Sequence, residues 1–382
     1  MFGFLSVIAG LMLVQTPVSE PDDWGDAPET DFAAALQTPQ ARAFDFWIGE
    51  WRSNWRLRDP DGLGFAAEGQ QVHQQVFTML GGKAVVELAW PLEATDAAGR
   101  ASGISIRYLD GETGDWIMAQ HWPRPGWDGV AFMDQLIGPE ENGRIELYSH
   151  DPARSTPETT STRRYTFTDI KPDHFRWEGA NTGDGGDSWS TWTVIDLYRL
   201  GQDAVSTPRG GPWPGFQPGR ICSEAPHGAF DVLEGRWTVS GADANGEPVN
   251  GHLDAGRLLD GCAIAGVLDI SGRETFLAWS WSSMLQLWTQ FSLSDAPGER
   301  HRYAIASSGG EGAVFFDAPG ATIASPTENY YAGLRGAPAA ALDRWVWQRL
   351  DAEGAVIVQE RRASPEADWT TASTYTLSPP SR

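Results

Sequence analysis

The chain has 382 residues, of which 11% are aromatic, with 43 Gly, 25 Pro and a formal net charge of -23. Aromatic segments broken by frequent Gly and Pro are typical of short strands and tight turns, and they exclude a helical bundle, which needs longer periodic runs. The acidic surface disfavours nucleic acid and anionic membranes as partners, because both repel a negatively charged protein.

The first residues of the chain predict export. Residues 4–14 are an uninterrupted run of apolar or small side chains. This run is too short to span a bilayer, and it lies where the apolar region of a secretory signal peptide is expected. We therefore predict a signal peptide over residues 1–19 and a periplasmic or secreted protein that is not stably inserted in a membrane.

An acidic leader over residues 20–40 follows, and it ends at the start of a short helix. Thr38 and Pro39 suit the N-cap and the first position of that helix. The helix would carry Phe44 and Trp47 on one face. That apolar face must be buried, and packing it into the open end of a barrel is the simplest way to do so.

The segment that begins at Phe44 occurs twice in the chain. Residues 44–51 and residues 230–237 both read Phe-Asp-x-x-x-Gly-x-Trp, and a Leu-x-Gly turn follows in each copy, at residues 80–82 and 259–261. Landmarks that recur in the same order predict a tandem duplication.

Each copy contains about ten short alternating segments separated by turn residues, which favours a meandering antiparallel barrel without exposed edges. We predict an all-β protein of two tandem barrels with short helices closing one end. The first barrel spans 41–200 and the second, degenerate one spans 227–378. A Pro- and Gly-rich linker over 201–226 joins them.

The motifs of the first copy resemble those of a known family. Phe44 to Trp51, Leu80 to Gly82, Gly185 to Trp189 and Tyr198-Arg199 are similar to motifs of the lipocalins and their calycin relatives. They resemble more closely a bacterial lipocalin-like family of unknown function, DUF1579. The resemblance covers nearly all of 41–200 and, more faintly, 227–378. It implies a barrel with an internal cavity and no established chemistry.

The repeated motif suits the closed end of a barrel. Gly permits a sharp turn from helix into strand, and Trp fills the narrow end. In calycins an Arg of the last strand stacks over that Trp, and the resemblance gives this role to Arg199. The predicted closure residues are Phe44, Trp47, Gly49, Trp51, Arg199, Phe230, Gly235 and Trp237.

Two histidines recur at equal offsets, His73 before Leu80 and His252 before Leu259. Alternation places His73 and Phe77 on one strand face, which we expect to face the cavity. An imidazole there would bind haem iron or act as a base. The alternative is a surface or core histidine inherited by duplication. No cofactor is predicted, and haem is the one candidate. His174 and His301 lack companions and are predicted to be surface residues.

Glu87 lies between apolar residues of one predicted strand, where a carboxylate would suit acid catalysis. The alternative is a strand whose solvated face carries Glu87, and the second copy has no carboxylate in the equivalent stretch 262–268. Glu87 and His73 are therefore only weak catalytic candidates. The residues predicted to contact a ligand are His73, Phe77, Glu87, Trp90, His121, Trp122, His252, Trp279 and Trp288.

The sequence lacks the motifs of the common enzyme classes. It contains no Gly-x-Ser-x-Gly elbow, zinc-protease motif, phosphate loop, dinucleotide fingerprint or Cys/His metal cluster. Cys222 and Cys262 form either one disulfide or two separate thiols.

We therefore predict an exported protein that holds a small apolar or aromatic molecule in a barrel. Two alternatives remain: a hydratase- or isomerase-type enzyme acting on a hydrophobic substrate, and a ligand-free structural or interaction module.

Overall fold

The computed structural model describes residues 40–59, 61–62, 64–91, 103–110, 114–121, 136–138, 140–141, 143–148, 162–201, 205–206, 226–282, 286–296, 299–317 and 341–379. The predicted signal peptide, nearly all of the acidic leader and most of the linker lie outside these residues. Among the described residues, no helix is both long enough and apolar enough to cross a membrane.

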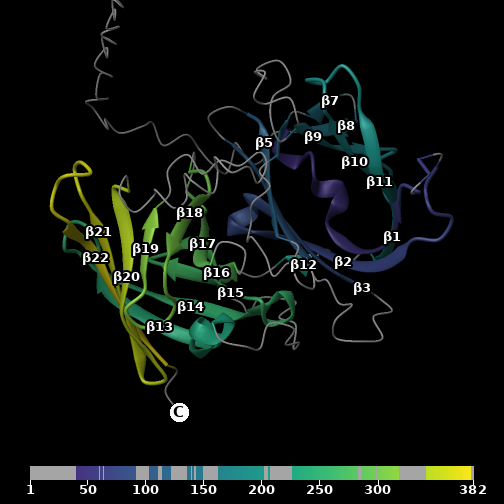
Figure 1. The fold of residues 1–382 in the computed structure, drawn as a ribbon. Coiled ribbons are helices and arrows are strands. Elements are labelled where there is room, and N and C mark those ends of the chain that lie inside the picture. Colours follow the sequence, from purple (N-terminus) through teal and green to yellow (C-terminus); the bar gives the residue numbers. More distant parts are fainter. Residues whose placement is uncertain are drawn as a thin grey trace, which may run out of the picture.

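The first barrel is a ring of antiparallel strands in chain order, in which β1 pairs with both β2 and β11 and so closes the ring (Figure 1). Its strands are β1 (Gly49–Leu57), β2 (Gln70–Met79), β3 (Ala84–Pro91), β4 (Gly103–Leu109), β5 (Trp116–His121), β6 (Leu136–Gly138), β8 (Arg144–Tyr148), β9 (Thr162–Thr168), β10 (His174–Thr182) and β11 (Ser190–Gly201). Two short strands extend the sheet: β7 (Glu140–Glu141) pairs with β8, and β12 (Val205–Ser206) adds to β2 in parallel.

The second barrel is closed in the same way, and its strands also follow one another in chain order. They are β13 (Gly235–Ala242), β14 (Pro248–Leu258), β15 (Ala263–Ile270), β16 (Arg273–Ser282), β17 (Leu287–Ser294), β18 (Arg302–Ala306), β19 (Val314–Asp317), β20 (Asp343–Asp351), β21 (Gly354–Arg361) and β22 (Thr370–Ser378). The predicted fold class, two tandem antiparallel barrels, is confirmed.

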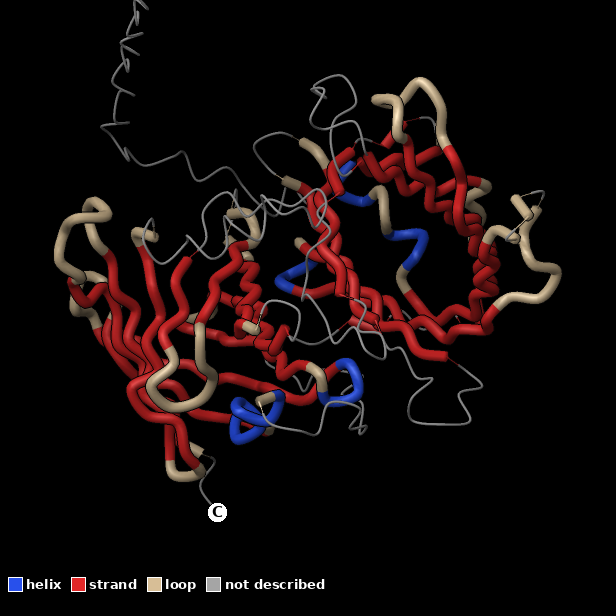
Figure 2. The backbone as a smooth tube through the Cα atoms, viewed as in Figure 1, coloured by secondary structure: helices blue, strands red, loops and turns tan. Residues whose placement is uncertain are grey.

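Helical turns precede the first strand of each barrel. The predicted short helix is present as two 3-10 turns, η1 (Gln40–Arg42) and η2 (Asp45–Trp47), and η7 (His227–Leu233) is its counterpart. Figure 2 shows the turns of the first barrel, in blue, within the ring of strands. In both copies Gly bends the chain into the strand, with φ of 128° at Gly49 and 123° at Gly235. Such angles strain any residue with a Cβ atom.

The Trp that begins each barrel is anchored to the helical turn before it. Trp51 Nε1 donates to the carbonyl oxygen of Trp47 at 2.6 Å, and Trp237 Nε1 donates to that of Leu233 at 2.9 Å. Arg199 on β11 lies over Trp51, with its guanidinium carbon 4.2 Å from the ring centroid, as the calycin resemblance implies. Its Nη1 and Nη2 donate to the carbonyl oxygens of Ile48 and Phe46. These contacts bind the last strand to the closed end.

A second pair of turns is also duplicated. η3 (Leu80–Gly82) joins β2 to β3, and η8 (Leu259–Gly261) joins β14 to β15. Leu80 and Leu259 both have φ of 56°, a left-handed conformation that is uncommon for a residue other than Gly. Both side chains are buried, so core packing holds the two leucines in this conformation.

The two barrels pack against each other through one continuous apolar cluster. In the first barrel the cluster includes Phe77, Val86, Ile104, Ile106 and Ile117, and in the second it includes Leu258, Ala265, Phe276, Phe291 and Leu293. The wall made by β2 to β5 therefore has an outer face that is buried against the second barrel. Its alternate residues face the interior of the first barrel, which explains why β3 and β4 are buried on both faces.

Polar contacts at the edge of this interface join the barrels. Lys83 Nζ donates to the carbonyl oxygens of Ser294, Ala296 and Glu299, each at 2.8 Å, and burial lowers the pKa of Lys83 to about 8. Asp110, buried at the end of β4, forms an ion pair with Arg300. The interface therefore combines an apolar centre with a polar rim.

Candidate functional site in the first barrel

The inner wall of the first barrel carries polar side chains on two adjacent strands. Glu87 on β3 pairs in register with Ser105 on β4, and Arg107 is the next inward residue of β4. Their neighbours Val86 and Ile106 belong to the interface with the second barrel. Because side chains alternate along a strand, Glu87, Ser105 and Arg107 face the interior.

These three side chains form a compact hydrogen-bonded set. Arg107 Nη2 donates to Glu87 Oε2 at 2.8 Å, and the Ser105 hydroxyl donates to the same oxygen. Glu87 is 3% exposed and Arg107 is 1% exposed. The first barrel thus encloses an ion pair that is almost completely removed from water.

The Arg107 guanidinium rests on aromatic rings of the closed end. Its carbon lies 3.8 Å from the Trp47 centroid, 5.6 Å from that of Phe44 and 5.9 Å from that of Phe167. Burial lowers the pKa of Arg107 and the charge of Glu87 opposes that shift. The guanidinium remains protonated, because its ordinary pKa is far above neutral. Aromatic faces and one carboxylate therefore stabilise a buried cation.

Some polar atoms of this interior lack hydrogen-bond partners. Among the described residues, Arg107 Nε and Nη1, Gln74 Oε1 and Trp47 Nε1 are buried without one. Gln74 precedes Val76 on the inward face of β2, and Val76 packs in the interior cluster. Buried donors and acceptors are normally satisfied, and a native exception calls for an explanation. The interior therefore has unused hydrogen-bonding capacity, most of it on a cation.

Among its described residues, the second barrel has no such set. The strand registers place Gly266 where the first barrel has Glu87, Leu277 in place of Ser105, and Trp279 in place of Arg107. The duplicated motif places Leu233 in place of Trp47. Trp279 Nε1 donates to Gln290 Oε1 at 2.8 Å. The same framework therefore closes around an apolar interior when a Trp replaces the buried ion pair.

Trp279 and Trp288, which we predicted to line a ligand site, pack as core residues of the second barrel. The Phe230 ring contacts Trp279 at 5.8 Å, Trp288 at 4.9 Å and Trp347 at 5.3 Å between centroids. Both tryptophans are 1% exposed. The interior of this barrel is occupied by its own aromatic rings.

The two duplicated histidines do not face a barrel interior. His73 alternates with Gln74 and Val76, so it shares the outer face of β2 with Phe77, which packs against the second barrel. Its Nε2 lies 3.4 Å from Glu50 Oε2. His252 alternates with the core residue Leu253, and its Nε2 lies 3.5 Å from Asp254 Oδ2. The predicted inward orientation of His73 and Phe77 is wrong, because the outer face of this strand is also buried.

The predicted residues of the barrel mouth are only partly described. Trp90 and His121 belong to the last residues of β3 and β5, and Trp122 lies outside the described residues. Of the candidates taken from the sequence, the structure places Glu87 in the interior set. Ser105 and Arg107 were missed, because they alternate with apolar residues in a run that reads as a buried strand.

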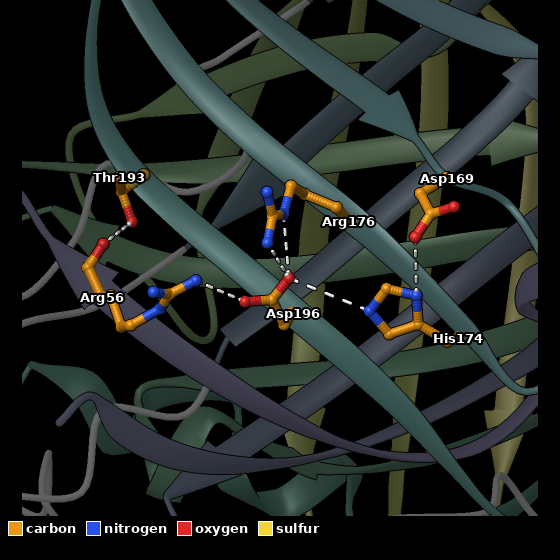
Figure 3. A network of polar contacts seen from close by, with 6 residues as sticks. All are labelled: Arg56, Asp169, His174, Arg176, Thr193 and Asp196. Atoms are coloured by element: carbon orange, nitrogen blue, oxygen red, sulfur yellow. Dashed lines mark hydrogen bonds and ion pairs between the residues drawn. The ribbon is translucent and has the colours of Figure 1, made fainter. Parts of the chain in front are cut away.

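The histidines predicted to lack companions have them. His174 lies on the outside of the first barrel, where its Nδ1 is 3.3 Å from Asp169 Oδ2 and its Nε2 is 3.8 Å from Asp196 Oδ1 (Figure 3). Arg56 and Arg176 also pair with Asp196. This network joins β1, β10 and β11 and is separate from the interior.

His301 lies at the interface between the barrels instead of on the surface. The Tyr108 hydroxyl is 2.7 Å from His301 Nδ1, and the Phe291 ring stacks on the imidazole at 5.4 Å. Burial, helped by the charge of Arg300, lowers the pKa of His301 to about 4. His301 is therefore neutral at physiological pH.

Two other predictions concern cysteine and metals. Cys262 is disulfide-bonded, and Cys222, the other cysteine of the chain, lies outside the described residues. Within the described ranges, no group of three or more His, Cys, Asp or Glu residues is arranged to hold a metal ion.

Comparison of the sequence with models of protein families, and with curated proteins, gave no match. Among solved structures, an S-type phycobiliprotein lyase from Guillardia theta is similar at 11% identity and a TM-score of 0.28, over 45% of this chain and 98% of the other. A DUF3598 protein of unknown function from Nostoc punctiforme is similar at 10% identity and a TM-score of 0.25, over 89% and 99%. These scores are too low to carry an argument, so the assignment of the fold rests on the strand order of the chain itself.

Proposed function

We propose that the protein is an exported, DUF1579-like binding protein, and that the interior of its first barrel takes one small, largely apolar or aromatic molecule. The observation that carries the proposal is the buried Glu87–Arg107 pair, whose cation has two donor nitrogens without a partner among the described residues. The proposal requires no cofactor. The second barrel would support the first and bind nothing in its interior.

The internal duplication provides the main support. A buried ion pair is weak evidence for stability, since well-packed apolar residues in its place are often neutral or stabilising. The second barrel has made this replacement with Gly266, Leu277 and Trp279 and is closed. Folding therefore does not require Glu87, Ser105 and Arg107. A ligand that uses the free donors of Arg107 gives a reason for their presence.

The proposal is tested by exchanging the interior of one barrel for that of the other. The variant W47L/E87G/S105L/R107W carries the residues of the second barrel at the matching positions of the first. Binding is followed with N-phenyl-1-naphthylamine, a neutral aromatic probe whose fluorescence rises in apolar surroundings. We expect the native protein to bind it and the exchange to weaken binding at least about tenfold, because a Trp fills the site.

The control is W279F, which alters the interior of the second barrel and should leave probe binding unchanged. Far-ultraviolet circular dichroism and thermal unfolding establish that each variant is folded. The proposal fails if the native protein does not bind the probe. It also fails if the folded exchange variant binds as tightly as the native protein, or if W279F alone abolishes binding.

Export has a separate test. The apolar run over residues 4–14 supports it, because the length of the run suits a signal peptide. We expect the intact mass of the protein from the periplasm or medium to lack approximately residues 1–19. Recovery of the uncleaved chain in the cytoplasm would contradict export while leaving the binding proposal unaffected.

A further inference from the structure

We infer that the molecule bound in the first barrel is neutral and presents an oxygen acceptor, such as a carbonyl, to Arg107, and that a carboxylate is disfavoured there. This inference deepens the proposed function and depends on it. It follows from the hydrogen-bonding capacity of Arg107 and from the charge balance of the interior.

The first step concerns hydrogen bonding. A guanidinium is a donor only, and Arg107 uses Nη2 on Glu87 while Nε and Nη1 have no partner among the described residues. A pure hydrocarbon bound beside Arg107 would keep those donors buried and unsatisfied. Nε and Nη1 lie on different edges of the guanidinium plane, so a single ligand oxygen accepts a hydrogen bond from only one of them. The ligand therefore carries at least one acceptor.

The second step concerns charge. Of the buried charged side chains described, only Glu87 and Arg107 lie on the inward faces of the first barrel, and they neutralise each other. Lys83 and Asp110 belong to the interface, and Asp196 lies in the outer network. Arg163, an inward residue by alternation, lies about 13 Å along β9 from Phe167. Among the described residues, the buried charge around Arg107 is therefore balanced, and the partly buried Arg199 at the closed end donates to backbone carbonyl oxygens.

A carboxylate at Arg107 would meet opposing effects. It would be attracted by the guanidinium and repelled by Glu87, which occupies Nη2 of the same group. Since the repulsion offsets part of the attraction, the cost of removing a carboxylate from water would be only partly compensated. A neutral carbonyl loses less hydration and still gains a hydrogen bond from a charged donor. The site should therefore prefer the carbonyl.

Three probes of matched shape test this preference by equilibrium dialysis at about pH 7, where naphthoate is ionised. They are 2-acetonaphthone, which is a ketone, 2-ethylnaphthalene, which has no acceptor, and 2-naphthoate. We expect the ketone to bind about tenfold or more tightly than either of the others, the usual effect of one hydrogen bond to a charged group. Naphthoate binding that equals or exceeds ketone binding would overturn the inference, as would equal binding of ketone and hydrocarbon.

Two variants separate charge from shape. E87Q keeps the size of the side chain and an acceptor for Arg107, but leaves the cation without a counter-charge. We expect E87Q to bind naphthoate about tenfold or more tightly than the native protein does, with little change for the ketone. In E87Q/R107M both charges and the free donors are gone, so the advantage of the ketone over the hydrocarbon should disappear.

The outcomes distinguish this inference from the proposed function. If none of the three probes binds to the folded native protein, the proposed function itself fails. If all three bind equally, the barrel is a binding site but the inference is wrong. If E87Q is folded and its naphthoate affinity is unchanged, charge balance does not govern selection.

Discussion

Arg107 shows how much one buried residue can reveal about a site. Its charge is balanced by Glu87, its plane lies on Trp47, and two of its nitrogens have no acceptor among the described residues. The sequence marked Glu87 as unusual because a carboxylate stands among apolar neighbours. It did not mark Arg107, since nothing in a run from Ile104 to Tyr108 shows that Arg107 lies beside Glu87. That proximity depends on the register between β3 and β4.

At the residue scale we predict that breaking the ion pair is far more costly than removing it. R107M should lower the free energy of unfolding by about 3–5 kcal/mol, because it leaves the Glu87 carboxylate buried without a counter-charge, with only the Ser105 hydroxyl as a hydrogen-bond donor. The double variant E87Q/R107M should be destabilised much less, since both charges are gone. Urea denaturation at neutral pH measures both. Equal destabilisation of the two variants would show that packing, and not charge, dominates at this position.

Among the structural elements, the two copies of the closing motif share the same features. Each has a helical turn, a Gly with positive φ, and a Trp that donates to the turn. The sequence predicted this unit because the residues that recur, Phe, Asp, Gly and Trp, are those that a closed barrel end needs. It predicted one helix where the structure has 3-10 turns, because hydrogen bonds in so short a segment are decided by what covers it.

The duplicated glycines allow a prediction about backbone strain. G235A should lower the free energy of unfolding by about 1–3 kcal/mol, because φ is 123° there and a Cβ atom would meet open space, so strain alone is measured. Thermal or urea unfolding gives the value. G183A is the matched control: its Cβ would also meet open space, and its φ lies outside the positive region, so it should be close to neutral. Similar losses in both variants would contradict this explanation.

In the whole molecule, the contact between the barrels determines the surroundings of each face of the sheet formed by β2 to β5. The outer face is covered by the second barrel. Glu87, Ser105 and Arg107 therefore lie on strands that are packed on both faces. This arrangement limits the freedom of Glu87 and Arg107 to move apart. It also places His301 and Tyr108 between the barrels, where titration can affect the whole assembly.

The interface therefore predicts a pH dependence of stability. An unfolded His takes up a proton near its ordinary pKa, whereas His301 in the folded protein does so only at about 4. Between these values the unfolded state binds more protons, so stability falls as pH is lowered from about 6.5 to about 4. When the pH falls over that range, the free energy of unfolding of H301F should decrease by about 2 kcal/mol less than that of the native protein.

Paired urea denaturations of the native protein and H301F near pH 6.5 and pH 4 measure this difference. Phe keeps a ring to stack on Phe291, and the neighbouring charged residues Lys83, Asp110 and Arg300 are present in both proteins, so the comparison isolates the imidazole. If the free energy of unfolding decreases equally in the two proteins between pH 6.5 and pH 4, His301 is not the cause of the pH dependence.

The order of residues along the chain was sufficient to predict the fold class, the duplication and the closed end of each barrel. These follow from local patterns: strand alternation, turn residues, and a Gly-x-Trp motif whose backbone and packing requirements are met within a few residues. Which strand faces are interior could not be predicted in this way, because it depends on how the two barrels pack. The packing of one barrel on the other buries the outer face of β2 to β5, so burial no longer distinguishes inside from outside. For that reason His73 and Phe77 were placed on the wrong side, and Arg107, with its free donors, was found only once the strands were in register.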